Sequence, residues 1–133
     1  MTMHLPALTL AYWCVLAAAL LPYVAAYIAK AGSFRGRDNQ APREWMTRQA
    51  GWRARALAAQ NNIFEGLAFF VGAVVIAHQL GAVQARLDML AAAYVLLRIV
   101  YIAFYILGLG TARSAAWALA FALNVAILFI AGR

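Results

Sequence analysis

The chain has 133 residues, of which 67% are hydrophobic and only 11% are charged. A soluble globular domain is typically about half apolar and about a quarter charged, so this composition excludes that class and indicates a protein surrounded by lipid. The formal net charge of +7 would fit a nucleic-acid partner. Seven of the eleven basic side chains are gathered at one connection between spans, however, and we expect no nucleic acid.

The first predicted span is a helix over residues 5–31. The run from Leu5 to Ala29 contains no charged residue, and a membrane-spanning helix needs only about 20 apolar residues. The run is too long and uniform for the apolar region of a signal peptide, so we expect it to remain in the mature protein. Cys14, the only cysteine, lies within it, which excludes an intramolecular disulfide and a cysteine metal site.

The next segment carries most of the positive charge. Residues 32–42 are expected to form a loop, and residues 43–52 a short interfacial helix that continues into the second span. The basic residues in this segment and at the adjoining ends of the first two spans are Lys30, Arg35, Arg37, Arg43, Arg48, Arg53 and Arg55. The positive-inside rule therefore predicts that loop 32–52 is cytoplasmic and that both termini are non-cytoplasmic. We expect an integral protein of a bacterial inner membrane, with anionic lipid headgroups beside these arginines.

Three further spans are expected, over residues 53–79, 87–107 and 112–131. The stretches 66–85 and 114–132 contain no Asp, Glu, Lys or Arg, whereas the third predicted span carries Arg98 near its middle. Short connections make neighbouring helices antiparallel. Residues 1–133 are therefore predicted to form a single all-α domain, a bundle of four transmembrane helices.

Polar side chains form one stripe on the second predicted span and another on the third. At 100° per residue, each stripe occupies a single helix face. The stripe on the second span consists of Arg55, Asn62 and Glu65, and that on the third of Arg98, Tyr101 and Tyr105. Because ionisable groups within a bilayer are costly, their default interpretation is functional.

The two stripes can be matched by depth. Glu65 and Arg98 are expected at similar distances from the cytoplasmic boundary, so that they meet as an ion pair. One interpretation is purely structural: a buried pair that sets the helix register. The other is a ligand pocket, because Arg55, Asn62, Tyr105 and Arg113 would line a basic funnel above the pair. Such a funnel suits a small acidic ligand, since arginine binds carboxylates bidentately.

The sequence from Arg55 to Glu65, RALAAQNNIFE, resembles the second-helix signature of the membrane-associated proteins in eicosanoid and glutathione metabolism, the MAPEG family, which includes the microsomal glutathione transferases. Arg98, Tyr105 and Arg113 resemble the arginine and tyrosine of that family's third helix and the arginine of the following turn. The resemblance extends over the whole chain in length, number of spans and expected orientation.

The resemblance implies a homotrimer that binds glutathione, as a cosubstrate, between subunits on the cytoplasmic side. It assigns Arg113 a catalytic role, the stabilisation of the glutathione thiolate. The glutathione contacts that it implies are Arg55, Asn62, Glu65, Arg98 and Tyr105, to which we add Tyr101 from the same stripe. One departure is Ala58, since many eukaryotic members carry an arginine seven residues before the glutamate. That departure puts one ligand contact in doubt.

Three functions from different classes remain open. The first is a glutathione-dependent transferase or peroxidase that acts on hydrophobic electrophiles dissolved in the membrane. The second is a noncatalytic lipid-binding or scaffold protein of the same fold. The third is a small multidrug exporter, although an exporter needs a carboxylate that titrates freely and Arg98 is expected to keep Glu65 ionised. His4 and His78 lie too far apart to indicate a metal site, and Asn124 is interpreted as an interhelical hydrogen-bonding residue that could also reach the cavity.

Overall fold

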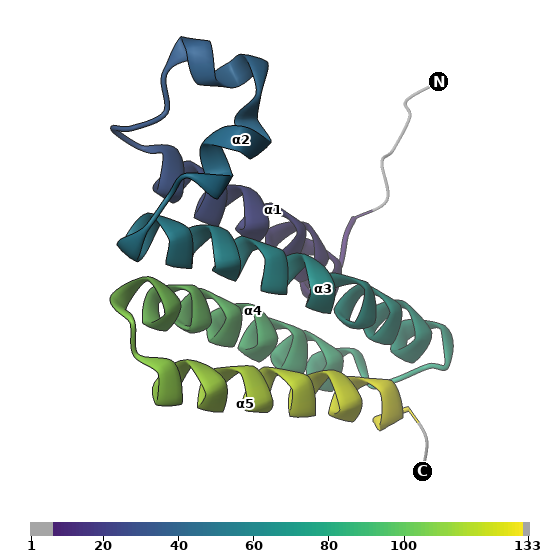
Figure 1. Ribbon diagram of the computed structural model, residues 1–133. Helices are drawn as coiled ribbons and strands as arrows, with labels where there is room; N and C mark the ends of the chain where they lie inside the picture. The colour runs from purple at the N-terminus through teal and green to yellow at the C-terminus, as the bar shows by residue number, and fades with distance from the viewer. Residues whose placement is uncertain (1–6, 132–133) are drawn as a thin grey trace, which may run out of the picture.

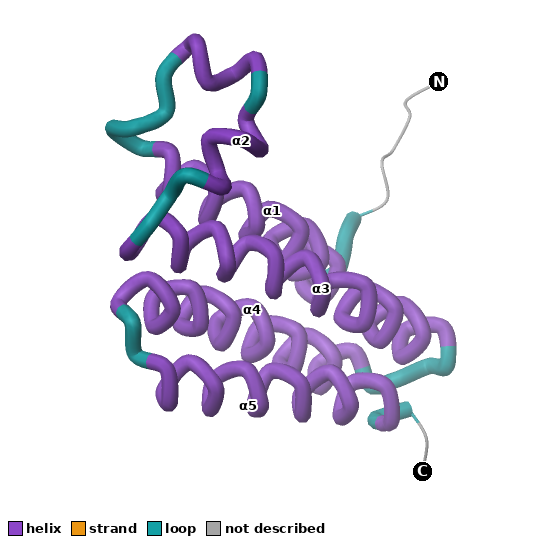
Figure 2. Tube along the Cα trace, in the orientation of Figure 1, coloured by secondary structure: helices purple, strands orange, loops and turns teal. Residues whose placement is uncertain are grey.

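The computed structural model describes residues 7–131, and these residues form long helices joined by short connections (Figures 1 and 2). The elements in chain order are α1 (Leu10–Lys30), the 3-10 helix η1 (Gly36–Gln40), α2 (Pro42–Thr47), α3 (Gly51–Gln79), α4 (Gln84–Leu107) and α5 (Gly110–Phe129). Within the described residues, four helices are long and apolar enough to cross a membrane: α1, α3, α4 and α5. The prediction of an all-α transmembrane four-helix bundle is confirmed.

The four long helices run antiparallel to their neighbours along the chain. Helix α1 packs against α3 and α4, and α5 packs against α4 and α3, so that α3 and α4 form the centre of the bundle. The α1–α3 and α4–α5 connections lie at one end, and the α3–α4 turn lies at the other end with the start of α1 and the end of α5 (Figure 1). The connection that precedes α4 and the connection that follows it therefore lie at opposite ends of the bundle.

Several helix boundaries differ from those expected. Residues 5 and 6 of the first expected helix lie outside the described residues, and α1 begins at Leu10 behind Thr9, whose side chain accepts a hydrogen bond from the amide of Tyr12. The interfacial helix does not continue into the second span, because Ala50 is extended and Gly51 has a positive φ of 60°. The third span starts at Gln84 rather than at residue 87.

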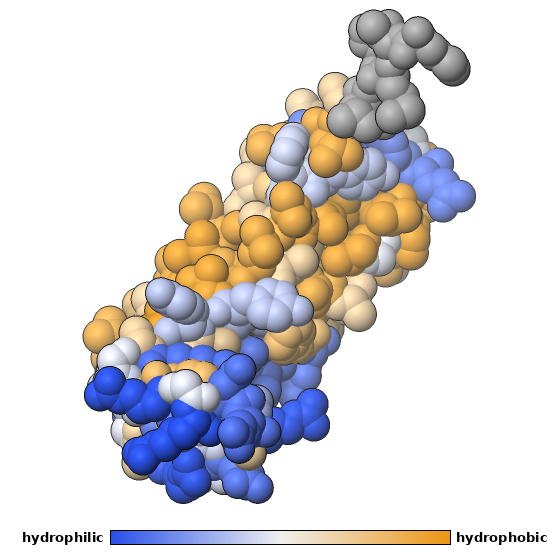
Figure 3. Space-filling view, turned by 90° about the horizontal axis from the view of Figure 1, so that it is seen from above, coloured by the Kyte–Doolittle hydropathy of each residue, from blue (hydrophilic) through white to orange (hydrophobic). Residues whose placement is uncertain are grey.

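One end of the bundle is strongly basic. The exposed side chains of Arg35, Arg37, Arg43 and Arg48 all belong to the segment that joins α1 to α3. The hydropathy surface shows hydrophilic residues gathered at this end and a band of hydrophobic residues next to it (Figure 3). This end, made of residues 31–50 and the α4–α5 turn, is called the basic end below.

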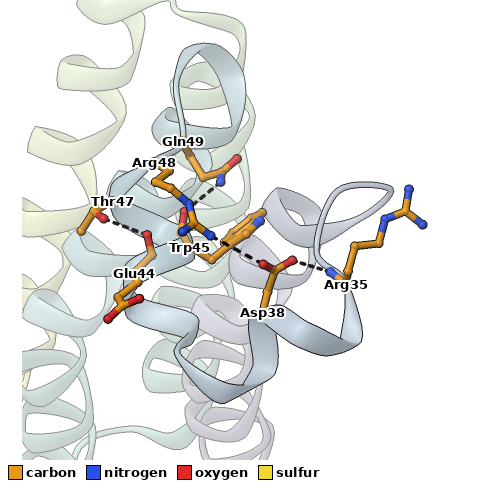
Figure 4. A network of polar contacts seen from close by, with 7 residues as sticks. All are labelled: Arg35, Asp38, Glu44, Trp45, Thr47, Arg48 and Gln49. Carbon is orange, nitrogen blue, oxygen red and sulfur yellow. Dashed lines mark hydrogen bonds and ion pairs between the residues drawn. The ribbon is translucent and has the colours of Figure 1, made fainter.

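The connecting segment at the basic end is folded on itself (Figure 4). Asp38 accepts a hydrogen bond from the amide of Arg35 at 2.8 Å and forms an ion pair with Arg48 at 3.6 Å. Trp45, which is buried, packs edge-on against Phe34 with ring centroids 5.2 Å apart. The loop therefore has its own small apolar centre, which keeps it against the ends of α1 and α3.

The helices approach one another through small residues. The buried face of α1 carries alanine at four positions, and the same residue type recurs on the buried face of α3; the α1 set is Ala11, Ala18, Ala25 and Ala29. Small side chains at such contacts bring backbones close, which favours packing where lipid supplies no hydrophobic driving force. Large apolar side chains such as Leu16, Leu20 and Val24 are exposed on the opposite face of α1, where they meet lipid.

Candidate functional site

Arg98 is the central charged group of the bundle interior. Its side chain on α4 is 3% exposed, and its Nη2 donates a hydrogen bond to Oδ1 of Asn62 on α3 at 2.9 Å. The expected ion pair between Arg98 and Glu65 is not formed. Glu65 lies one helical turn further along α3 and is exposed, so the amide of Asn62 binds the guanidinium without the desolvation of a second charge.

A cavity of about 230 Å³ opens beside this hydrogen bond, and it is called the inner cavity. Helix α3 supplies two of its polar groups, Asn62 and Glu65, and α4 supplies Arg98. The complete lining is Asn62, Glu65, Gly66, Phe69, Tyr94, Arg98, Trp117, Ala120, Phe121 and Asn124. Glu65 and Arg98 therefore share a cavity, as their matched depth predicts, although they do not pair.

A second cavity of about 250 Å³ lies nearer the basic end, and it is called the outer cavity. It is lined by Asn62, Tyr101, Tyr105, Arg113, Ser114 and Trp117. Asn62 and Trp117 line both cavities, so the two adjoin. Together they reach the size range of ligand pockets, about 300–1,000 Å³.

A continuous row of cationic and aromatic groups connects the two cavities. The guanidinium of Arg98 lies 4.4 Å from the ring centroid of Tyr101, which packs edge-on against Tyr105 at 5.7 Å. The guanidinium of Arg113, on the first turn of α5, lies 4.4 Å from the ring of Tyr105. Cation–π contacts of this kind hold arginines in place without neutralising them, so both remain available to an anionic ligand.

Arg55 lies outside this arrangement. It lines neither cavity, and its Nε donates a hydrogen bond to the carbonyl of Ile106 in the last turn of α4 at 3.0 Å. Its guanidinium also lies against Gly108, which ends α4 with a φ of 76°. The structure thus gives Arg55 a structural partner, and a ligand contact for this residue stays a prediction.

Ala58 also faces a different space. It lies in a groove of about 700 Å³ between α2 and α3, together with Gln60 and Asn61. Ala58 lines neither the inner nor the outer cavity.

Seven residues that line the inner cavity were not among the expected ligand contacts: Gly66, Phe69, Tyr94, Trp117, Ala120, Phe121 and Asn124. A methyl group on Gly66 would lie 3.5 Å from the hydroxyl of Tyr94 and 3.8 Å from Nη2 of Arg98, so the glycine leaves space beside both groups. Asn124 carried a signal in the sequence, as a polar residue in the middle of a span. Gly66 and Trp117 could not be recognised from the sequence as cavity-lining residues, because glycine and tryptophan are common in transmembrane helices.

Comparisons with known proteins bear on the family. A comparison with curated proteins and a comparison with solved structures gave no match. The family model of the MAPEG family matches residues 10–133, which include all four membrane-spanning helices and both cavities. The chain therefore belongs to the MAPEG family.

Proposed function

We propose that the protein is a membrane-embedded glutathione transferase or peroxidase that acts on hydrophobic electrophiles. Membership of the MAPEG family supports a role in glutathione or lipid metabolism. The observation that carries the proposal is the row from Arg98 through Tyr101 and Tyr105 to Arg113, which follows the two adjoining cavities. Glutathione has two carboxylates, and arginine is the side chain best suited to bind them.

In this proposal Arg113 is the catalytic residue. Its guanidinium, held over the ring of Tyr105 at the mouth of the outer cavity, stabilises the thiolate form of glutathione and lowers the pKa of the thiol. The thiol proton leaves to water at the basic end. In conjugation, the thiolate sulfur then forms a bond to the electrophilic carbon, and the electron pair passes to the leaving group or to the ring or double bond attacked.

The assembly and orientation proposed here follow from the family and from the charge distribution. We propose a homotrimer in which a neighbouring protomer closes the open side of the two cavities, so that glutathione is bound between protomers. The basic end is proposed to face the cytoplasm of a bacterial inner membrane, because its exposed arginines far outnumber those at the other end. Hydrophobic substrates would then arrive through the bilayer while glutathione arrives from the cytoplasm, and the protein brings the two together.

The test is glutathione binding by isothermal titration in detergent, followed by the ultraviolet absorbance of the thiolate. We expect wild-type protein to bind glutathione and to develop the thiolate band. Arg113→Ala should still bind, but should lose the band and reduce the conjugation rate on the order of 10²-fold, as the loss of one stabilising donor does elsewhere. Arg37→Ala, which removes an exposed loop arginine, is the matched control and should retain both.

Two results would contradict the proposal. Binding without a thiolate band in the wild type would indicate a noncatalytic glutathione-binding protein. No binding at all would favour the lipid-binding or scaffold alternative. The exporter alternative is set aside because the chain belongs to the MAPEG family. The argument against it from the sequence relied on an ion pair between Arg98 and Glu65, and that pair is not formed.

A further inference from the structure

The innermost part of the inner cavity contains two buried polar groups without a partner. Asn124 on α5 and Arg98 on α4 are each 3% exposed. Among the described residues, neither Oδ1 of Asn124 nor Nε of Arg98 has a hydrogen-bond partner. One of these atoms is an acceptor and the other a donor, and both belong to residues that line the inner cavity.

The position of Arg98 is fixed by contacts that do not use its Nε. Nη2 is bound to Asn62, and the guanidinium plane lies on the ring of Tyr101. The Nε–H is therefore buried without a partner in a residue that lines the cavity. The terminal torsion of Asn124 is broad, so its oxygen can reorient towards a ligand group. Space beside the guanidinium of Arg98 comes from Gly66, which has no side chain to fill it.

Such a pair of groups selects its ligand by chemistry. A buried polar atom without a hydrogen bond costs about 1–3 kcal/mol, so a ligand that satisfies both atoms binds more tightly than one that satisfies only one. The ligand group must accept from Arg98 and donate to Asn124. A carboxylate alone can only accept. An α-amino acid group, with its carboxylate and ammonium on one carbon, does both.

We infer that Asn124 is a specificity-determining residue of the glutathione site, an inference that rests on the proposed function. The ammonium of the γ-glutamyl end donates to Oδ1 of Asn124, and the carboxylate of the same end accepts from Nε of Arg98. The glycine end of glutathione offers its carboxylate and a neutral amide N–H, which is a weaker donor to Asn124 than an ammonium. Glu65 lines the same cavity and adds negative charge where the ammonium lies.

This placement agrees with the order of the two adjoining cavities. With the γ-glutamyl end in the inner cavity, the cysteine of the tripeptide falls towards the outer cavity, which Arg113 lines. The protein then distinguishes glutathione from other thiols by its amino group, because Asn124 and Glu65 both favour a donor at the inner end.

The test compares two ligands by isothermal titration in detergent: glutathione, and glutaryl-cysteinyl-glycine, in which hydrogen replaces the α-amino group. Both carry the thiol and both carboxylates. Wild-type protein should bind glutathione at least about tenfold more tightly, since hydrogen bonds to charged groups contribute about 1.5–3 kcal/mol. In Asn124→Leu this ratio should fall at least about fivefold. Asn124→Ala serves as a second variant if the leucine prevents folding.

The ratio of the affinities for the two ligands distinguishes a ligand contact of Asn124 from a role in packing alone. Equal loss of affinity for both ligands in Asn124→Leu would show that Asn124 only supports the fold, and equal binding of both ligands by the wild type would also overturn the inference. In either case the proposed function stands, whereas a wild type that binds neither ligand refutes both. Asn61→Leu is the matched control, because Asn61 lines the groove between α2 and α3, and it should keep the wild-type ratio.

Discussion

Arg98 shows how one buried arginine can be held without a counter-ion. Its guanidinium donates a hydrogen bond to an amide oxygen on α3 and lies over an aromatic ring on its own helix. The residue also lines the inner cavity. A pair with Glu65 would have neutralised Arg98 and removed both charges from the cavity. The observed arrangement keeps the positive charge available to an anionic ligand, which is the property that the proposed function needs.

Gly66 provides a test of the inner cavity at the scale of one residue. Glycine within a helix is about 0.8–1 kcal/mol less favourable than alanine, so Gly66→Ala should raise the stability of the protein. The added methyl lies at ordinary contact distance from Tyr94 and Arg98, so the fold accepts it. It occupies part of the cavity, however, and glutathione affinity measured by titration should fall at least about fivefold.

The matched control for this substitution is Gly72→Ala. Gly72 lies on the same helix, lines neither cavity, and has no atom within 4 Å of the position that a methyl would occupy. It should show the gain in thermal stability without the loss of affinity. If both variants bind glutathione equally well, the ligand does not enter the inner cavity.

At the scale of whole helices, neighbouring elements cap one another's ends. The carboxylate of Asp88 on α4 accepts a hydrogen bond at 2.9 Å from the amide of Ala11, in the first turn of α1. Arg53 on α3 donates to the carbonyls of Ala29 and Ala31 at the other end, at 2.6 and 2.7 Å. An anion at the N-terminus and a cation at the C-terminus both complement the helix dipole, so α1 is held at each end by another helix.

Arg53 and Arg55 have parallel roles near the start of α3. Arg53 binds the end of α1, and Arg55 binds the end of α4. The N-terminal part of α3 thus ties together the two helices between which it lies. The contact of Arg55 with Ile106 lies directly before the turn that leads from α4 to α5.

Arg53→Leu tests this arrangement. The substitution removes two hydrogen bonds from the end of α1 and should lower the free energy of unfolding by about 1–3 kcal/mol. Unfolding in detergent, followed by circular dichroism, measures the change. Arg48→Leu is the comparison, because the Arg48 side chain is 63% exposed and its ion pair with Asp38 should contribute no more than about 1 kcal/mol. Equal destabilisation by the two substitutions would speak against a capping role.

For the whole molecule, close helix packing rests on alanine. Ala25 on α1 is completely buried and belongs to an apolar cluster with Ala59, Ile63 and Tyr101. Ala25→Leu should force α1 away from α3 and destabilise the bundle by about 1–3 kcal/mol. Thermal unfolding in detergent measures this loss. Ala122→Leu, at an exposed position on α5, should leave the midpoint nearly unchanged, and a tolerated Ala25→Leu would contradict tight packing at this contact.

The predictable part of the site came from helix periodicity. The spacing of Asn62 and Glu65, and that of Arg98, Tyr101 and Tyr105, placed each set on one face, and the structure brings these faces together around adjoining cavities. Arg55 shares the periodicity of the first set but binds the end of α4 instead. Periodicity assigns a face but not a partner, because a long arginine side chain reaches any acceptor within several ångströms.

The sequence by itself determined that the protein lies in a membrane and crosses it with four helices. The physical reason is that a bilayer requires every backbone polar group to be satisfied within its own segment, so an apolar run of about 20 residues has one possible structure. The tertiary structure alone decided that Arg98 binds Asn62, that Arg53 and Arg55 cap other helices, and that Asn124 lines the inner cavity. These contacts depend on how far each helix is rotated and shifted against its neighbours, and hydrophobic patterns do not define those quantities to within the length of a hydrogen bond.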